Sequence, residues 1–400
     1  MIPVLLLPCA AFGLASGEDG DFNLKLTGYF KNIIAYSEAS AFPVDLLLGI
    51  PQNKYFDFGE IHEPGHWDDL SRLRTKLEGR YGQHWDGEIQ TELRGIASRP
   101  DLKIGGYITT APAARRWLNM DATMYDEPGY QVTGFVDRMW VRWAPSWGEV
   151  VLGRQAITWT VGHLWYPMDR FGPFLPFTIE QDEKPGLDAA NLAINLGALG
   201  EFRIIFAPLE RSKDDRIGAR IRANVYGFDF QVMGGYFSEE YVGGMGVAHN
   251  FYGAVARAEY AYSHTLSDAP DRWSAIAGID RSFRKKLYAL LEYYHQSAGE
   301  TNTDLYYKSF PIYASGEIFG LGRDYLGAMA RISPWAEWSF AALGIINLND
   351  SSGFVSPQIE YDYGQNLKII LAASLSVPNG PRSEFGLFSS AYYLSFKGYF

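Results

Sequence analysis

Hydrophobic and polar residues alternate with a period of two along most of this 400-residue chain, from residue 24 to the C-terminus. In residues 72–81 the odd positions are apolar, small or aromatic, and the even positions read Arg, Arg, Lys, Glu, Arg. After a short turn, residues 85–94 repeat this pattern. Such alternation is typical of β-strands with one apolar and one polar face, and convincing helical periodicity is absent. The pattern therefore predicts an all-β protein.

The connections between the predicted strands distinguish a membrane barrel from a soluble β-sandwich, which also alternates. Short turns near 82–83, 145–148, 198–200, 227, 249–250, 284–285, 334–335 and 364–365 alternate with longer connections, the longest near 37–69, 96–133, 157–189, 298–323 and 378–388. Outer-membrane barrels have this asymmetry, with short periplasmic turns and long extracellular loops. We therefore predict a transmembrane antiparallel up-and-down β-barrel of ~18 strands. The expected strands are 24–36, 70–81, 84–95, 134–144, 149–156, 190–197, 201–208, 215–226, 228–237, 240–248, 251–262, 272–283, 286–297, 324–333, 336–347, 354–363, 366–377 and 389–400.

Two details support this count. An even number of strands returns both ends of the chain to the periplasm, and without strand 240–248 the long and short connections fall out of phase. In the last strand, aromatic or apolar residues alternate to a terminal Phe400. This resembles the C-terminal signature that the barrel-assembly machinery reads, which makes that machinery an expected partner.

Composition agrees with a barrel and excludes a helical membrane bundle. Aromatic residues make up 16% of the chain, Gly contributes 42 residues, and charged residues reach only 20%. The longest apolar run, residues 1–15, is shorter than the ~20 residues of a spanning helix. The net charge of −11 argues against a nucleic-acid partner.

The N-terminus predicts export. We interpret residues 1–15 as a signal peptide, 16–23 as a periplasmic tail and 24–400 as the barrel. The basic residues that normally begin a signal are missing, as they would be in a truncated one. Cys9 is the single cysteine, so the mature chain would have no disulfide and no Cys-based metal or haem site.

Arginines are frequent on the polar face that would line the lumen. An arginine ladder could offer forked donors to carboxylates or phosphates in a water-filled pore, and pairing across neighbouring strands is the structural alternative. The candidate pore-lining residues are Arg72, Arg74, Arg80, Arg94, Arg138, Arg142, Arg154, Arg216, Arg220 and Arg222. Because most come from strands 2–8 and inward acids are more prominent in the last third, we expect one wall to be positive and the other negative.

Residues 152–173, Leu-Gly-Arg-Gln-Ala-Ile-Thr-Trp-Thr-Val-Gly-His-Leu-Trp-Tyr-Pro-Met-Asp-Arg-Phe-Gly-Pro, carry the most specific motif. They resemble a segment of alginate-export-type outer-membrane barrels and related porin-like proteins, in which a strand ending in Gly-Arg-Gln runs into a loop with Trp, Gly and a Pro-x-Asp turn. The resemblance implies that Arg154 points into the pore and that loop 157–189 folds inward as a constriction or as a brace. The constriction candidates are Trp159, His163, Trp165, Asp169 and Arg170.

Other chemistry finds little support. His62 and His66 have a spacing seen in metal sites, but Pro64 and Gly65 forbid the helix that would align them. Residues 347–352 could cradle Ca²⁺, although ordinary turn chemistry explains them better. No recognisable catalytic set occurs, so we predict no enzyme, no metal and no cofactor.

Together these observations predict a Gram-negative outer-membrane porin. Polar solutes, in particular anionic ones, would pass by diffusion through its lipid-embedded barrel. Two alternatives remain open. One is an export channel for a polyanionic polysaccharide such as alginate. The other is a barrel that sheathes a multihaem cytochrome, for which this chain could supply only the sheath, because it has no haem-attachment motif.

Overall fold

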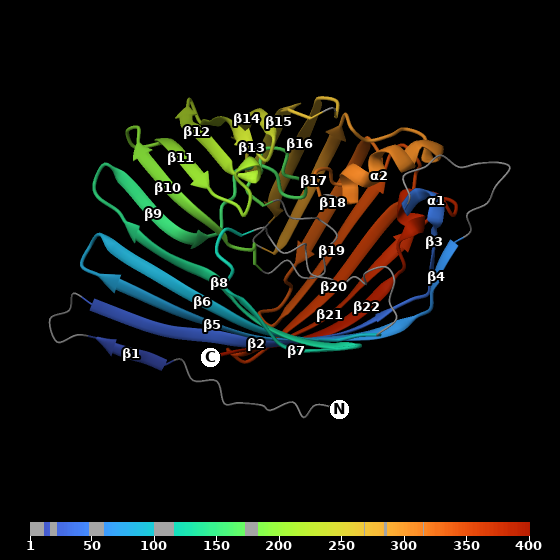
Figure 1. Cartoon of the computed structure of the whole chain (residues 1–400), viewed down its shortest axis with the longest axis horizontal. Helices are drawn as coiled ribbons and strands as arrows, with labels where there is room; N and C mark the ends of the chain where they lie inside the picture. Colours follow the sequence, from blue (N-terminus) through green and yellow to red (C-terminus); the bar gives the residue numbers. More distant parts are fainter. Residues whose placement is uncertain are drawn as a thin grey trace.

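A computed structural model of the chain describes residues 12–16, 22–47, 60–99, 116–172, 183–267, 269–283, 286–314 and 316–400. Eighteen strands form a closed antiparallel up-and-down barrel (Figure 1). They are β2 (Phe22–Ser37), β5 (His66–Tyr81), β6 (Trp85–Ala97), β8 (Tyr130–Trp143), β9 (Gly148–Gln155), β10 (Leu187–Asn195), β11 (Gly200–Ala207), β12 (Arg216–Val225), β13 (Phe228–Phe237), β14 (Glu240–Phe251), β15 (Ala254–Thr265), β16 (Arg272–Phe283), β17 (Leu287–Gln296), β18 (Asp324–Ile332), β19 (Trp338–Asn347), β20 (Gly353–Tyr363), β21 (Leu367–Val377) and β22 (Ala391–Tyr399). The predicted strand count is confirmed, and the predicted strand 240–248 corresponds to β14.

The barrel closes where β22 pairs with β2, from Tyr29↔Tyr399 to Ser37↔Ala391. The terminal residue takes part in this closure, because Phe400 and Gly28 exchange two backbone hydrogen bonds of 2.9 Å. Gly28 is needed here, since a Cβ atom at that position would lie 2.5 Å from the Phe400 ring. Closure satisfies the backbone groups along the wall, which a barrel in lipid requires.

The two ends of the barrel differ in the length of their connections. One, the turn end, carries eight connections of two to five residues, such as 226–227 and 252–253. The other, the loop end, carries the long connections 38–65, 98–129, 156–186, 297–323 and 378–390. Loop-end connection 238–239 is an exception of two residues, and both have positive φ, as tight hairpin turns require. Both β2 and β22 have their chain-terminal ends at the turn end, as the asymmetry of the sequence predicts.

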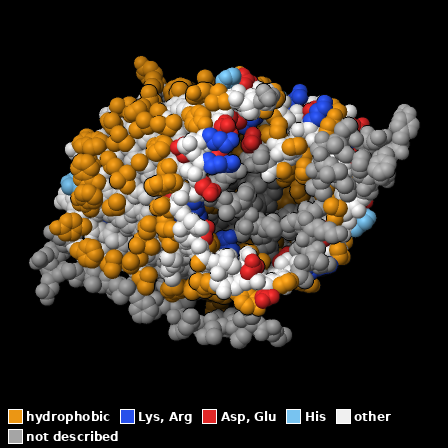
Figure 2. All heavy atoms as spheres, in the orientation of Figure 1, with side chains coloured by type: hydrophobic (Ala, Val, Ile, Leu, Met, Phe, Trp, Pro, Cys, Tyr) orange, Lys and Arg blue, Asp and Glu red, His pale blue; other side chains and the backbone are white. Residues whose placement is uncertain are grey.

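Side chains alternate between the two faces of the wall. On β13, for example, Phe230 and Val232 are exposed on the outer face, whereas Gln231 and Met233 are only 4% exposed on the inner face. Apolar side chains accordingly cover the outer wall in Figure 2, and charged side chains gather around a hollow. Exposed aromatic residues form a band near each end, as interfacial girdles do. At the turn end they include Trp85, Trp143, Trp147, Tyr252 and Trp335, and at the loop end Trp67, Tyr241, Tyr262, Trp273 and Tyr293.

Additional elements belong to the loop end and to the N-terminus. The expected long loop 96–133 contains β7 (Asp121–Glu127), which forms a hairpin with β8, and loop 38–65 contains the paired strands β3 (Ser40–Pro43) and β4 (Glu60–Glu63). Short helices that the periodicity did not predict are α1 (Val44–Leu47), α2 (Tyr306–Ala314) and the 3-10 turns η1 (Ser212–Asp214), η2 (Thr303–Leu305) and η3 (Glu384–Leu387). No helix in the described ranges has the length and apolar character needed to cross a membrane. Strand β1 (Phe12–Ser16) pairs with β2 and overlaps the expected signal peptide, whose first eleven residues lie outside the described ranges.

Candidate functional site

The connection that follows β9 lies inside the barrel. Its described residues 156–172, here called the inner loop, run along the inner wall (Figure 1). The inner loop contacts the wall in two regions. In the first, Trp159, Met168 and Phe171 are at most 2% exposed and pack against inner-face residues of β10, β11, β13, β14 and β15. In the second, Leu164 and Trp165 pack against inner-face residues of β16 to β20 and of the loop-end connections. The loop therefore spans about half of the wall.

Two buried carboxylates of the wall hold the inner loop. The carboxylate of Glu292 on β17 accepts three backbone N–H bonds from the loop, donated by residues 163, 164 and 165 at 3.0, 3.0 and 2.9 Å. The carboxylate of Glu259 on β15 accepts from the Thr160 hydroxyl at 2.8 Å and from the N–H groups of residues 161 and 168 at 2.7 and 2.6 Å. Glu292 is 0% and Glu259 2% exposed. Because charge-assisted bonds are about twice as strong as neutral ones, these two residues fix the loop's path.

The Gly-Arg-Gln motif fixes the start of the inner loop. Gly153 has φ 115°, and a Cβ atom there would lie 2.2 Å from the Met139 carbonyl oxygen. Arg154 is 0% exposed, and its Nε and one terminal nitrogen donate to both carboxylate oxygens of Asp188 at 2.9 and 3.0 Å. It also donates to the backbone carbonyls of residues 118 and 136. Gln155 is held in turn by Asn191 at 3.0 Å. The motif thus joins the end of β9 to β10 and to the segment before β7, and the Arg154 guanidinium does not reach open space.

The constriction candidates fall into two groups. Trp159, Trp165 and Asp169 are buried at 1, 1 and 2% exposure and form the loop's interior. Asp169 pairs with Lys184, and burial raises the pKa of Asp169 while it lowers the pKa of Lys184. This ion pair holds the inner loop to the end of the same connection, in addition to the bonds with Glu259 and Glu292 of the wall.

His163 and Arg170 are the candidates that retain exposure. The His163 side chain is 40% exposed and lies beside Arg257 and Asp280, with its Nε2 3.6 Å from a carboxylate oxygen of Asp280. Burial, and then the charge of Arg257, lower the pKa of His163. Arg170 is half-buried, and a terminal nitrogen donates to the Ser263 hydroxyl at 2.9 Å.

Four arginines of the predicted ladder belong to one buried network on the inner faces of β5, β6 and β8. Arg72 and Arg74 are 4 and 3% exposed, and both donate to Glu92. Arg94 also donates to Glu92, at 2.7 Å. Arg138 pairs with Asp137 at 2.7 Å. A bulge between positions 90 and 91 in the β6–β8 register leaves Asp137 without a backbone partner on β6, and its carboxylate binds both Arg138 and Arg74 of β5.

Three further arginines of the ladder are bound to groups of the wall or of the inner loop. Arg142 donates to Asp86 at 2.7 Å. Arg220 donates to Glu201 at 3.1 Å. Arg216 donates to the carbonyl oxygen of Arg170 at 3.0 Å. In the part of the wall formed by β5 to β12, arginines and acids therefore alternate, so cross-strand pairing neutralises much of the expected positive side.

The two remaining ladder residues differ from these. Arg80 and Arg222 are exposed on the inner face near the turn end. Neither has an ion pair within the described part of the chain. They are the ladder's water-facing cations.

The alternation of the sequence places Glu259 and Glu292 on the inner face of their strands, but it does not identify them as anchors of the loop. A usable signal was present for Glu292, whose inward neighbours Leu290 and Tyr294 carry no charge, whereas Glu259 has Arg257 two positions away on the same face. A charge in such surroundings requires a partner from elsewhere in the fold. In the described ranges, which include His62 and His66, no cluster of three or more His, Cys, Asp or Glu residues is placed to hold a metal ion.

No family model matches the chain, and no curated protein matches it by sequence. Solved structures do match it. The structure is similar to Pseudomonas aeruginosa OccK5 (OpdH), with a TM-score of 0.57, 9% identity and coverage of 94% of this chain and 97% of the other. It is also similar to Pseudomonas aeruginosa OccK8 (OprE), with a TM-score of 0.53, 7% identity and coverage of 94 and 98%. For Acinetobacter baumannii OccAB4 the values are 0.52, 9%, and 94 and 98%.

The chain has the fold of an outer-membrane porin-like barrel. This confirms the porin-like part of the resemblance read from residues 152–173. At identities of 7–9% the likeness concerns the fold alone, so solute and selectivity have to be argued from this chain's own residues.

Proposed function

We propose that the protein is a channel of the bacterial outer membrane through which polar solutes diffuse, with a preference for anions. The inner loop is the observation that carries this proposal. It is attached to one side of the wall by Glu259 and Glu292, so it narrows the bore while the opposite side stays clear of its described residues. A barrel of this strand number is wide enough for an aqueous channel, and a loop on the inner wall sets its effective width.

The preference for anions rests on charges that the wall does not neutralise. Most inner arginines form pairs with acids and contribute little net field to a passing ion. Arg80 and Arg222 lack such partners in the described ranges and face the water at the turn end. Two such cations on the low-dielectric wall of a narrow bore raise the local concentration of anions.

The inner loop also bears on the two alternative functions. A multihaem cytochrome inside the barrel would need the space that the loop occupies along β10 to β20. A polysaccharide export channel stays compatible with the fold, and the wall arginines would serve it as well as they serve small anions. The first alternative predicts no conductance, and the second predicts passage of oligosaccharides.

Reversal potentials in planar bilayers test the proposal. The refolded full chain in a KCl gradient is expected to conduct and to favour chloride. Changing both exposed arginines, Arg80→Gln with Arg222→Gln, should shift the reversal potential toward cation preference. The matched control is Arg281→Gln, because Arg281 is an exposed arginine on the outer face of β16, with its guanidinium 5.2 Å from the Phe283 ring centre.

The two parts of the proposal fail in different ways. Absence of conductance from a correctly folded barrel would refute the channel. Conductance with a reversal potential that the double variant leaves unchanged would refute the role of the two arginines.

The terminal strand ending in Phe400 further supports recognition by the barrel-assembly machinery. A Phe400 deletion tests this through the amount of folded protein in the membrane.

A further inference from the structure

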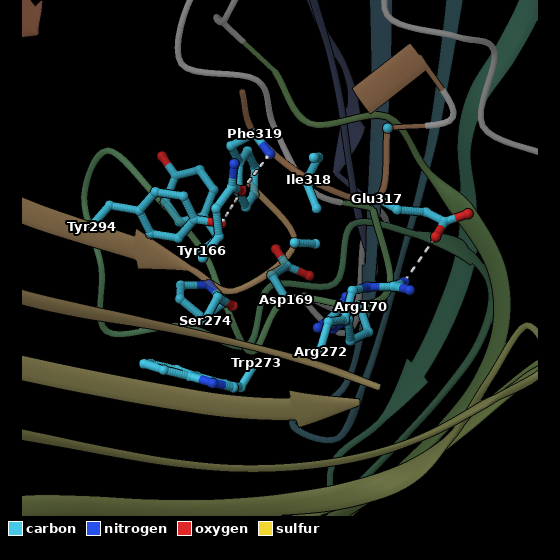
Figure 3. A pocket seen from close by; sticks show the side chains of 14 residues that line it. Tyr166, Asp169, Arg170, Arg272, Trp273, Ser274, Tyr294, Glu317, Ile318 and Phe319 are labelled. Carbon is cyan, nitrogen blue, oxygen red and sulfur yellow. Dashed lines mark hydrogen bonds and ion pairs between the residues drawn. The ribbon is translucent and has the colours of Figure 1, made fainter. Parts of the chain in front are cut away.

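A small cavity lies between the inner loop and the loop-end connection 297–323 (Figure 3). Its floor is formed by the inner loop from Tyr166 to Arg170, and its sides come from the start of β16, the end of β17 and residues 316–319. It sits on the inner wall toward the loop end, so a solute that enters from this end passes it on the way into the bore.

Two arginines, Arg170 and Arg272, line the cavity. Arg272 is 9% exposed at its side chain and pairs with Glu240 and with Glu317, the latter at 2.9 Å. The Arg170 side chain makes one hydrogen bond, to the Ser263 hydroxyl, and has no carboxylate within ion-pair distance in the described ranges. The Nε–H groups of both arginines are buried without a hydrogen-bond partner in the same ranges. A buried donor without an acceptor is unfavourable, so the hydrogen bonding of these two arginines is incomplete.

The carboxylate of Glu317 indicates which kind of group would complete the hydrogen bonding of the two arginines. Glu317 lies on the connection 297–323, its side chain is 47% exposed, and it reaches into the cavity to contact Arg272 (Figure 3). Glu240, by contrast, lies on β14, and its side chain is only 10% exposed. Glu317 can therefore leave with little loss of packing, whereas Glu240 cannot. Burial, and then the charge of Arg272, lower the pKa of Arg170, which is the effect expected where two cations share too few anions.

We propose that Arg170 and Arg272 form a binding subsite for the anionic end of a solute, with Glu317 as an internal carboxylate that the solute displaces. The proposal rests on the proposed channel function and names a site within it. A terminal carboxylate or a phosphate has the acceptor geometry that two guanidinium groups recognise. Tyr166, which is only partly buried, also lines the cavity and offers aromatic surface to the part of the solute next to that group.

Block of the chloride current by small anions measures occupancy of the subsite. The refolded full chain is studied in planar bilayers with acetate, succinate or inorganic phosphate added on the loop-end side. We expect a saturable decrease of the single-channel current. Arg170→Gln should raise the half-blocking concentration at least tenfold, and Glu317→Gln should lower it several-fold, because the internal competitor has been removed.

The opposite signs of these two effects are the diagnostic result. If Glu317 were only structural, Glu317→Gln would weaken block or leave it unchanged, and either outcome would overturn the displacement. An unchanged half-blocking concentration in Arg170→Gln, with conductance intact, would overturn the subsite. Arg281→Gln is the control variant. If acetate and succinate block but phosphate does not, the subsite is selective for carboxylates, and the reverse order assigns it to phosphates.

The subsite and the channel can also fail separately. If the folded protein does not conduct, the channel proposal fails, and calorimetric titration of the detergent-solubilised protein with acetate, succinate and phosphate still reports the site. Should Arg170→Gln not refold, Glu317→Gln alone decides the question, because its half-exposed position makes it tolerant of substitution.

Discussion

Removing the carboxylate of Glu292 should release the second half of the inner loop while the barrel stays closed. The variant Glu292→Ala leaves three backbone N–H groups of residues 163–165 without their acceptor. A buried donor without a partner costs about 1–3 kcal/mol. The three sum to about 3–9 kcal/mol, and water that enters the vacated space recovers part of this. We therefore expect about 3 kcal/mol, which corresponds to a roughly hundredfold larger population of released loop.

Two measurements report this release. Hydrogen exchange of peptides from residues 156–172 should accelerate by about the same factor, and single-channel recordings should show extra conductance levels. Glu292→Gln keeps one acceptor oxygen and replaces the other with an amide donor, so its effect should be smaller. The matched control is Glu360→Ala, which removes an inner-face carboxylate of β20 that is bound to Arg331 and Lys368 and has no hydrogen bond to the inner loop.

The reasoning is refuted if Glu292→Ala leaves both the exchange of residues 156–172 and the conductance levels unchanged. It is also refuted if the control matches the effect of Glu292→Ala, since the loop would then respond to any loss of inner charge. Loss of the folded barrel in Glu292→Ala would show that the loop supports the wall itself.

Three other perturbations have expected outcomes. Arg154→Ala leaves Asp188 buried without its cation, so the free energy of unfolding in detergent should fall by about 3–5 kcal/mol. Arg154→Lys should have an intermediate effect, and unchanged stability would contradict the role of the buried pair. Burial raises the pKa of Glu384, on η3, from 4.5 to about 7. Between these pH values Glu384 keeps its proton when connection 378–390 is packed and loses it when the connection is released. The packing of this connection should therefore weaken as pH rises, by about 3 kcal/mol in all, and proteolysis rates should report the change. The pH dependence should vanish in Glu384→Gln. Gly28→Ala places a Cβ atom against the Phe400 ring, and the yield of closed, heat-resistant barrel on gels should fall, whereas Gly79→Ala, with its nearest contact at 3.6 Å, should not change it.

The strands were predictable because lipid on one side and water or protein on the other impose alternation on every strand of the wall. Even strand 240–248, which has four glycines or alanines among nine residues, was recovered from the phase of the connections. Helix α2 was not predicted, since it has nine residues and contains Pro311. Strand β7 was hidden because its seven residues are all exposed, so no apolar face marks them.

The candidate site was predictable only as a segment. Residues 152–173 indicated an inward loop, but the path of that loop depends on contacts with Glu259 and Glu292 across about 90 to 130 positions of sequence. No local pattern encodes such contacts. The arginine ladder shows the same limit, because Arg74 is paired with Asp137 across 63 positions through an irregular register that only the folded wall defines.

This pairing changes what an arginine-rich inner wall means. A charge that is matched within a few ångströms produces a field that decays quickly, so the buried network around Glu92 and Asp137 stiffens the wall and does little to select ions. Under the proposed channel function, selectivity would then depend on the cations that have no ion pair in the described ranges, Arg80 and Arg222 at the turn end and Arg170 in the inner loop. Because Arg170 lies toward the loop end, beside Ser263, and the other two arginines lie near the turn end, the proposal predicts attraction of an anion from either side. The number of arginines on the inner face is therefore a poor guide to selectivity, and their pairing is the quantity that decides it.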